Sequence, residues 1–181
     1  MIILFIRGFA GAGKDTFGRI FTEQLGYKRF AFADYLKEMV SAKYGVPLYM
    51  LHSQAGKEGY TPDETRTWRQ VLLDEAAEAR DRNPDVFASM CADAMFRETT
   101  YDKFVITDWR FPNELRVLRD RFPSAKIFTI LIRRRIQNGV SPVEHSSEYH
   151  LLEHSPDFIV ENNGSEADLY ARAKYILQVV E

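Results

Sequence analysis

The sequence contains very little cysteine, because Cys91 is the only one among its 181 residues. A single thiol excludes an internal disulfide and any cysteine-based zinc site. Cys91 stands at helical spacing from Ala88, Ala92 and Met95, which favours a buried small side chain over a catalytic thiol. We therefore expect this cysteine to have a structural role.

Long hydrophobic runs and an excess of charge of one sign are also absent. The only apolar run near the N-terminus covers residues 2–6 and ends just before Gly8, so we expect neither a signal peptide nor a membrane span. Lysine and arginine number 24 against 26 aspartates and glutamates, a formal net charge of -2. This balance predicts no bulk attraction to nucleic acid or to an anionic membrane. We expect a soluble, cytoplasmic protein without either partner.

Short apolar segments alternate along the chain with stretches of helical periodicity. This alternation predicts an α/β fold of three layers, in which a five-stranded parallel sheet is flanked by helices. The length suits one domain, residues 1–181. Strands are predicted at residues 2–6, 27–33, 104–107, 126–132 and 157–160. Helices are predicted at residues 14–25, 34–44, 62–81, 84–99, 113–121, 142–153 and 165–180.

Two of these helices carry the same start signal. Thr61 and Ser141 each precede a proline and stand three residues before a glutamate, the pattern of a capping box. The predicted core covers residues 1–33 and 103–181, and residues 34–102 form a mainly helical insertion. In a mononucleotide-binding α/β fold, an insertion at this place commonly binds a second substrate.

The stretch GFAGAGKDT, residues 8–16, follows the first predicted strand and nearly matches the phosphate loop pattern G-x-x-x-x-G-K-[ST]. Gly8, Gly11 and Gly13 would let backbone amides turn towards phosphate groups, and Lys14 adds a cation at the start of a helix. A glycine-rich turn with a solvated lysine is the alternative. The buried strand before the loop and the amphipathic helix after it make that alternative the weaker one.

Asp15 occupies the position where the pattern places a magnesium-binding hydroxyl. A carboxylate beside a triphosphate requires a magnesium ion or its water between them, or a turn of the side chain to cap the helix. Thr16 still offers a hydroxyl to a phosphate. Motor and switch NTPases generally use the missing hydroxyl, so Asp15 favours a small-molecule kinase.

Asp108 follows a buried strand, at the sheet edge where open α/β folds bind ligands. It could hold magnesium-bound water or accept a proton from an incoming group, and a helix or turn cap is the alternative. Asn113 is the better candidate to cap the next helix. No second acid follows Asp108, which favours transfer to a bound acceptor over hydrolysis.

Asp34 and Lys37 stand after the second strand. A role in the site and a structural role, with Asp34 as an N-cap and Lys37 as an exposed side chain, are equally compatible with the sequence.

Arginines occur in two groups that could serve phosphoryl transfer between anions. Arg66, Arg69 and Arg80 lie on or beside a helix of the insertion, and residues 133–135 are three consecutive arginines after a central strand. Any one of these side chains could equally be solvated or ion-paired. His145 and Glu148 stand one helical turn apart, which suits a structural hydrogen-bonded pair.

Six motifs together resemble the deoxynucleoside monophosphate kinases encoded by DNA viruses, chiefly large tailed bacteriophages. In order they are GAGKDT at 11–16, FADYLK at 32–37, TWRQVL at 67–72, TDWRFPNE at 107–114, HSSE at 145–148 and DFIVENNGS at 157–165. The resemblance implies a P-loop kinase that transfers the γ-phosphoryl of ATP, with Mg2+, to a deoxynucleoside 5'-monophosphate for DNA precursor synthesis. It also implies the host cytoplasm as location, and it leaves a homodimer open because the chain is shorter than better-known members.

The resemblance assigns roles to residues that match these motifs. ATP and its metal are assigned to Gly8, Gly11, Ala12, Gly13, Lys14, Asp15 and Thr16, with Asp108 as a further metal residue and with Asn162 and Asn163 near the adenine. The acceptor is assigned to Asp34, Lys37, Arg66, Trp68, Arg69 and Gln70. The reaction centre is assigned to Lys14, Asp108, Arg110, Arg133 and Arg134.

Two other functions remain open from the sequence alone. One is a phosphomevalonate kinase-like enzyme or another small-molecule P-loop kinase, such as the more distant dephospho-CoA kinases. The other is a regulatory or assembly ATPase that binds nucleotide and turns over little. The segment LLDEAAEAR stands where a glycine often follows the RQxL motif in the family, which leaves the shape of the base pocket open.

Overall fold

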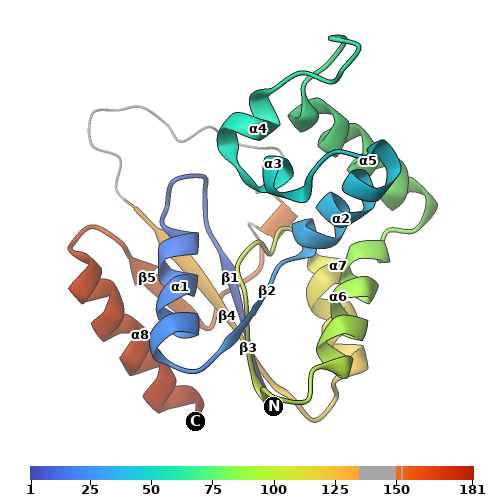
Figure 1. The fold of residues 1–181 in the computed structure, drawn as a ribbon. Helices are drawn as coiled ribbons and strands as arrows, with labels where there is room; N and C mark the ends of the chain where they lie inside the picture. The colour runs from blue at the N-terminus through green and yellow to red at the C-terminus, as the bar shows by residue number, and fades with distance from the viewer. Residues whose placement is uncertain (135–149, 152) are drawn as a thin grey trace.

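The computed structural model describes residues 1–134, 150–151 and 153–181 of the chain (Figure 1). Three predictions lie wholly or largely outside these residues. They are the helix at 142–153 with its cap Ser141, the pair of His145 and Glu148, and any role of Arg135. Among the described residues, no helix has the length and apolar character needed to cross a membrane.

The described residues form a sheet of five parallel strands in the order β2-β3-β1-β4-β5. Its strands are β1 (Ile2–Arg7), β2 (Lys28–Phe30), β3 (Lys103–Ile106), β4 (Lys126–Arg133) and β5 (Phe158–Glu161). The predicted α/β fold is therefore confirmed. Because every strand runs the same way, all carboxyl ends meet at one edge, which is where the candidate site lies.

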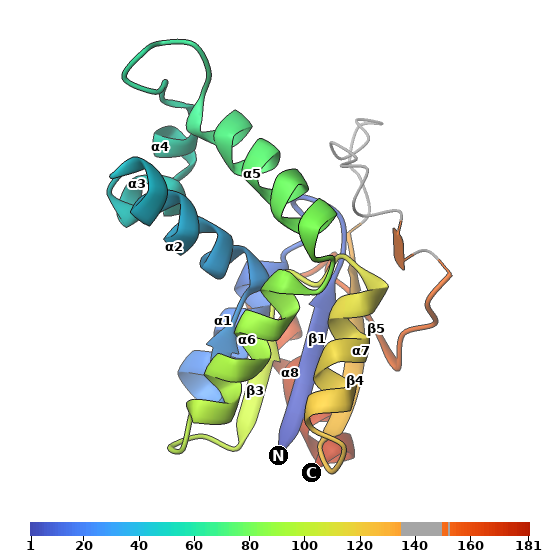
Figure 2. The same cartoon turned by 90° about the vertical axis from the view of Figure 1, so that its right-hand side faces the viewer.

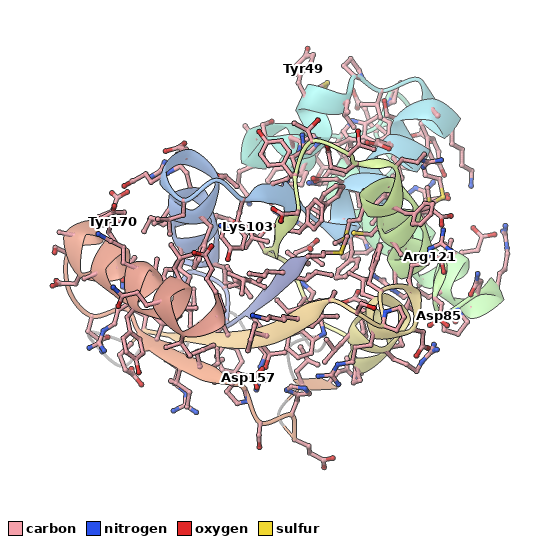
Figure 3. All side chains as sticks on the ribbon, turned by 90° about the horizontal axis from the view of Figure 1, so that it is seen from below. Tyr49, Asp85, Lys103, Arg121, Asp157 and Tyr170 are labelled. Carbon is pink, nitrogen blue, oxygen red and sulfur yellow. The ribbon has the colours of Figure 1, made fainter. Side chains whose placement is uncertain are left out.

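Alternating side chains of the central strand β1 divide the core into two layers. Ile3 and Phe5 pack towards α2 (Phe32–Tyr44), α6 (Val86–Arg97) and α7 (Pro112–Arg121). Leu4 and Ile6 pack on the other face towards α1 (Lys14–Gln24) and α8 (Glu166–Val180). This alternation follows from the two-residue period of a strand. Figure 3 shows side chains filling the space between the sheet and the helices.

Three helices of the insertion project beyond the carboxyl edge of the sheet (Figures 1 and 2). They are α3 (Leu48–His52), α4 (Gln54–Glu58) and α5 (Trp68–Arg82), and we call residues 48–82 the projecting unit. Of the remaining helices of the insertion, α6 packs beside the sheet, whereas α2 begins at the sheet edge and leads towards α3 and α5 (Figure 2). The projecting unit therefore stands over the edge where the glycine-rich loop also emerges.

The predicted start of α5 at residue 62 is wrong, because the helix begins at Trp68. The Thr61 hydroxyl lies 2.5 Å from Asp63 Oδ1 and 3.0 Å from the carbonyl oxygen of Arg66, which stabilises a turn instead of a helix start. Thr67 is the N-cap, and its hydroxyl accepts a 3.3 Å hydrogen bond from the amide of Gln70. The capping pattern identified a real turn but placed the helix six residues early.

Other boundaries differ by smaller amounts. The second strand ends at Phe30 and α2 begins at Phe32, so Asp34 lies in the first turn of the helix and Ala31 is the N-cap. The short helices α3 and α4 were not predicted. Cys91 is fully buried in the core layer beside α2, as predicted.

Candidate functional site

The glycine-rich loop connects the end of β1 to the start of α1 in a conformation that requires glycine. Gly13 has φ 100°, and a Cβ atom there would lie 2.3 Å from Asn162 Nδ2. Gly8 has φ 153°, and a Cβ atom there would lie 2.4 Å from the carbonyl oxygen of Ile132. The loop is therefore packed directly against β4 and the end of β5. Both glycines are needed for this close approach.

Lys14 bends back over its own loop. Its Nζ donates hydrogen bonds to the carbonyl oxygens of Gly8, at 2.5 Å, and of Phe9, at 3.0 Å. The cation thus lies at the concave side of the loop, at the N-terminus of α1, where the helix dipole also favours an anion. Phosphate oxygens placed there would meet both.

Asn162 braces the loop from the opposite end of the chain. Its Nδ2 donates a 2.8 Å hydrogen bond to the carbonyl oxygen of Ala12, and its side chain is almost fully buried. Asn163 follows it at an exposed position. The predicted contact of both residues with adenine stays a prediction. The structure adds a role for Asn162 in holding the phosphate loop.

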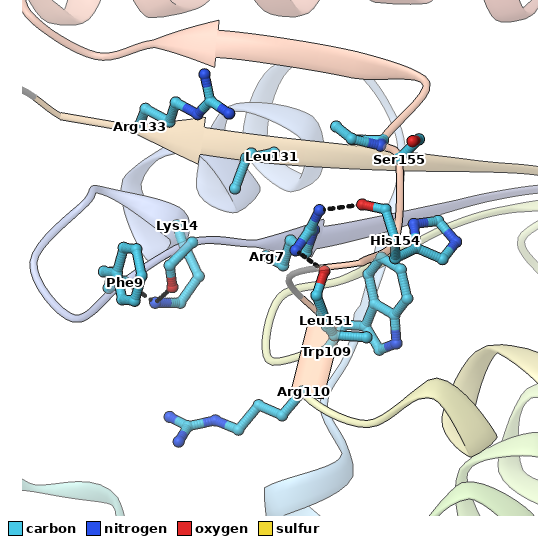
Figure 4. Close-up of a pocket in the computed structure, with 12 residues that line it drawn as sticks. Arg7, Phe9, Lys14, Trp109, Arg110, Leu131, Arg133, Leu151, His154 and Ser155 are labelled. Carbon is cyan, nitrogen blue, oxygen red and sulfur yellow. Dashed lines mark hydrogen bonds between the residues drawn. The ribbon is translucent and has the colours of Figure 1, made fainter. Parts of the chain in front are cut away.

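A cavity of about 260 Å3 opens beside this loop (Figure 4). Among the described residues that line it, four are basic and none carries a carboxylate. The basic residues are Arg7, Lys14, Arg110 and Arg133. Like charges gathered in a partly enclosed space produce a positive potential that favours an anion. The cavity is therefore suited to phosphate groups.

Arg7 was missed by the sequence analysis. Only 7% of the residue is exposed, and its guanidinium donates to the carbonyl oxygens of Leu151 and His154. It also lies 5.9 Å from the centre of the Trp109 ring. Burial, and then the charge of Arg133, lower the pKa of Arg7. An arginine at the end of a buried strand, directly before a glycine loop, was the signal that could have indicated it.

Asp108 lies at the carboxyl edge as predicted, and its carboxylate caps α2. Oδ1 accepts a 3.0 Å hydrogen bond from the amide of Phe32, and Oδ2 accepts one of 2.8 Å from the amide of Ala33. Burial raises the pKa of Asp108, while these two amides lower it. Asp108 is therefore a helix cap, which was the alternative open from the sequence. It caps α2, about 75 residues earlier in the chain, and not the helix that follows it.

The prediction that Asn113 caps α7 is wrong. Glu114 does so, because its Oε2 accepts 3.0 Å hydrogen bonds from the amides of Arg110 and Phe111. Asn113 instead donates 2.9 Å hydrogen bonds to the carbonyl oxygen of Pro84 and to the Asp85 carboxylate. It joins α7 to the turn before α6.

Basic side chains of α2 and of the projecting unit also lie near one another. Lys37 binds Asp34 at 3.0 Å, and Arg69 binds Glu58 at 2.7 Å. Burial, followed by the charges of Arg69 and Lys37, lowers the pKa of Lys57. We call Lys37, Lys57 and Arg69 the insertion cation cluster. Lys57 was missed by the sequence analysis, because one lysine in a five-residue helix carries no distinctive pattern.

The insertion cation cluster is electrostatically linked to the phosphate loop. Asp15 is exposed in the first turn of α1, and its charge raises the pKa of Lys57, opposing the effect of burial. His52 Nδ1 lies 3.3 Å from Lys37 Nζ, and Arg29 binds Asp34 at 2.7 Å. Lys57 therefore lies within electrostatic reach of Asp15 at the start of α1.

Three predicted acceptor residues are less well placed. Trp68 is only 4% exposed and packs edge-on against Tyr44, which does not support base stacking by its ring. Arg66 is paired with Asp74 at 3.1 Å. Gln70 is exposed on α5, one residue and about 100° around the helix from Arg69.

Arg134, which was predicted for the reaction centre, is exposed just after β4. Among the described residues, no contact defines its role.

The described residues contain no group of three or more acidic, histidine or cysteine side chains that could enclose a metal ion. Magnesium in nucleotide sites usually keeps several waters and is bound through phosphates with one or two carboxylates. Asp15 and Thr16, in one turn beside the loop, suit such an ion. Asp108 is less suited to direct contact, because each of its oxygens already accepts an amide. The residues fit magnesium that is bound mainly by phosphates.

No protein-family model and no curated protein matches the sequence. Solved structures do match. A shikimate kinase from Aquifex aeolicus has a TM-score of 0.52 and 12% identity, over 98% of this chain and 97% of that one. A dephospho-CoA kinase from Campylobacter jejuni has a TM-score of 0.51 and 17% identity, over 97% and 95%.

A third similar structure is an APS kinase from Mycobacterium tuberculosis, with a TM-score of 0.50 and 10% identity, over 98% of this chain and 96% of that one. The chain has the fold of the P-loop kinases. Sequence identities this low establish the fold and leave the substrate to be argued from the site.

Proposed function

We propose that this protein is a small-molecule kinase that transfers the γ-phosphoryl of ATP to a deoxynucleoside 5'-monophosphate. The observation that carries the proposal is the cavity beside the phosphate loop, whose described lining holds four basic residues and no carboxylate. Phosphoryl transfer between two anions needs cations aimed at both and at the charge on the transferred group. The similarity to structures of small-molecule kinases supports the same reaction class.

The donor side of the site is the phosphate loop. Loop amides and Lys14 would bind the ATP phosphates, with Lys14 exchanging its present carbonyl partners for phosphate oxygens. Magnesium would supply charge neutralisation between the phosphates, beside Asp15 and Thr16. Arg110, in the loop after β3, and Arg133, at the end of β4, also line the cavity, and they would contact the transferred group.

The acceptor side is the insertion cation cluster together with one face of α5. Arg69 and Arg80 are 11 residues apart, which places them within about 20° of each other around the helix. Leu73, 60% exposed, lies on this face between them and offers an apolar surface. A ligand with one anionic group and one flat apolar part matches this combination. A nucleoside monophosphate has both.

A different small-molecule kinase is the second candidate, and the fold is equally compatible with it. The discriminating measurement is a coupled assay of ADP release with ATP and magnesium. The acceptors are a panel of ribo- and deoxyribonucleoside monophosphates, with phosphomevalonate as the non-nucleotide member. We expect at least one deoxynucleoside monophosphate to stimulate ADP release and to be converted to the diphosphate.

The other outcomes of this assay decide between the alternatives. Stimulation by phosphomevalonate alone would replace the acceptor and keep the kinase. ADP release that no acceptor stimulates would overturn the kinase proposal in favour of an ATPase. Equal use of ribo- and deoxyribonucleotides would keep the reaction and remove the deoxy preference.

A further inference from the structure

We propose that Arg80 and Glu114 are a positioning pair that fixes the loop at residues 108–111 and thereby directs Arg110 into the cavity. Neither residue lines the cavity as described. The catalytic readouts of this inference rest on the proposed function, whereas its structural readout does not. The pair would connect the projecting unit, through α5, to the reaction centre.

Glu114 determines the backbone of the loop. Its side chain lies in the interior, since the residue is 4% exposed, and one carboxylate oxygen accepts the amides of both Arg110 and Phe111 at 3.0 Å. Two amides converging on one oxygen fix the direction in which the Arg110 side chain leaves the loop. Trp109 adds a third restraint, since its indole donates a 2.9 Å hydrogen bond to the carbonyl oxygen of Phe111.

Arg80 reaches the same loop from the projecting unit. Its guanidinium carbon lies 4.6 Å from the ring centre of Phe111, in the loop, and 5.0 Å from that of Phe87, in α6. A half-buried cation against two aromatic faces is held in place by the ring quadrupoles and by packing. Arg80 therefore joins α5, α6 and the loop at one point.

Arg80 and Glu114 act on each other's pKa. Burial raises the pKa of Glu114 to about 8, and the amides of Arg110 and Phe111 and the charge of Arg80 act in the opposite direction. Burial also lowers the pKa of Arg80, and the Glu114 carboxylate opposes this. A buried carboxylate without its cation would be strongly penalised. Each residue thus favours the charged form of the other.

Several other charged and titratable groups face this pair. Asp108 and Arg110 belong to the loop itself. Both of their charges act on Arg80, whereas Glu114 feels the charge of Asp108 and the backbone amide of Arg110. Cys91 faces Glu114 from α6 as a buried thiol. The centre of the His150 ring lies 5.0 Å from the centre of the Phe111 ring. Arg80 is the member of this set that comes from the projecting unit.

The structural test uses tryptophan fluorescence, because Trp68 and Trp109 are the two tryptophans of the chain. In a Trp68→Phe background, emission reports on Trp109 alone, one residue before Arg110. Arg80→Met and Glu114→Gln should each shift the emission and increase its quenching by acrylamide. Arg82→Met is the matched control, since Arg82 lies two residues further along α5 and pairs with the exposed Glu78. Its emission should equal that of the background.

The catalytic test measures kcat and KM for ATP and for the acceptor that the panel assay identifies. Arg80→Met should lower kcat by roughly 100-fold, the size expected when a catalytic group is displaced by about 1 Å, while KM for ATP changes little. Arg80→Lys, which keeps the charge but loses the planar contact, should recover part of kcat. The double variant with Glu114→Gln should lose less than the product of the single losses, because the two act through one loop.

The outcomes separate this inference from the proposed function. Wild-type emission and wild-type kcat in folded Arg80→Met and Glu114→Gln proteins would overturn the positioning pair. If no acceptor is phosphorylated, the proposed function fails, and the fluorescence result alone decides the pair. If Arg80→Met does not fold, Arg80→Lys and Glu114→Gln decide it in the same two measurements, with thermal unfolding as the check of foldedness.

Discussion

The two sides of the candidate site are built in different ways. The donor side is a loop of backbone whose shape depends on Gly8 and Gly13 and on a brace from Asn162. The acceptor side consists of long side chains from α2 and the projecting unit, such as Lys37 and Arg69, which form ion pairs with neighbouring carboxylates. A preformed backbone site suits a ligand part that is common to many substrates, such as a phosphate group. Adjustable side chains bind what distinguishes one substrate from another.

The largest expected effect belongs to the donor side. Lys14→Ala should lower phosphoryl transfer by about 1,000-fold, because no other lysine lines the described cavity to replace the charge at the loop. The measurement is kcat/KM for ATP, with Lys174→Ala on α8 as the control. Activity within a few fold of wild type in Lys14→Ala would remove the phosphate loop assignment.

The second effect concerns stability. Gly13→Ala combines a left-handed backbone with a contact of 2.3 Å to Asn162, so we expect a loss of about 2 kcal/mol in the free energy of unfolding by urea. Gly26→Ala is the matched comparison, since Gly26 has φ 75° but nothing within 4 Å of its Cβ position. It should lose about 1 kcal/mol. Equal losses would mean that the approach of Asn162 to the loop contributes nothing.

The third effect tests the acceptor side. Arg69→Met should raise KM for the acceptor by about 10-fold and leave KM for ATP nearly unchanged, because Arg69 belongs to the insertion cation cluster. Arg66→Met should change both constants less, since Arg66 lies outside the insertion cation cluster and pairs with Asp74 further along the chain. A larger rise in KM for the acceptor in Arg66→Met than in Arg69→Met would place the acceptor beside Arg66 instead of the insertion cation cluster.

The last effect is a pH dependence of stability. The pKa of Glu114 is about 8 in the folded protein and near 4.5 when it is exposed in the unfolded chain, so only the folded protein keeps this proton between these values. Its contribution to stability therefore falls as pH rises from about 4.5 to 8 and is constant above. Thermal unfolding of Glu114→Gln should show a shallower decline over this range. Parallel curves for both proteins would contradict the raised pKa.

The fold and the donor side could be predicted from the sequence because both depend on local patterns. Buried strands, the spacing of Gly8, Gly13 and Lys14, and the position of Asp108 after a strand are all visible within a few residues. Helix starts were less accurate. At Thr61 the same hydroxyl that could cap a helix stabilises a turn, and the competition between these two depends on neighbours such as Asp63.

The acceptor side could be predicted only in part, since contacts over long sequence separations determine it. Trp68 looked like a ligand contact and is core, whereas Lys57 carried no signal and lies in the insertion cation cluster. Arg7 is apparent only when Leu151 and His154 are seen beside it. These pairings depend on tertiary structure, which one sequence does not specify by local rules.

The hydrogen bond from Asn162 to Ala12 also has a consequence for synthesis. The two residues are 150 positions apart, so the first loop of the chain stays unbraced on the ribosome until the strand that precedes Asn162 has been made. A nascent chain that ends after β4 would contain every residue of the glycine-rich loop without the contact that holds it. The loop would then reach its braced conformation late in translation, at about the moment when the fifth strand completes the sheet.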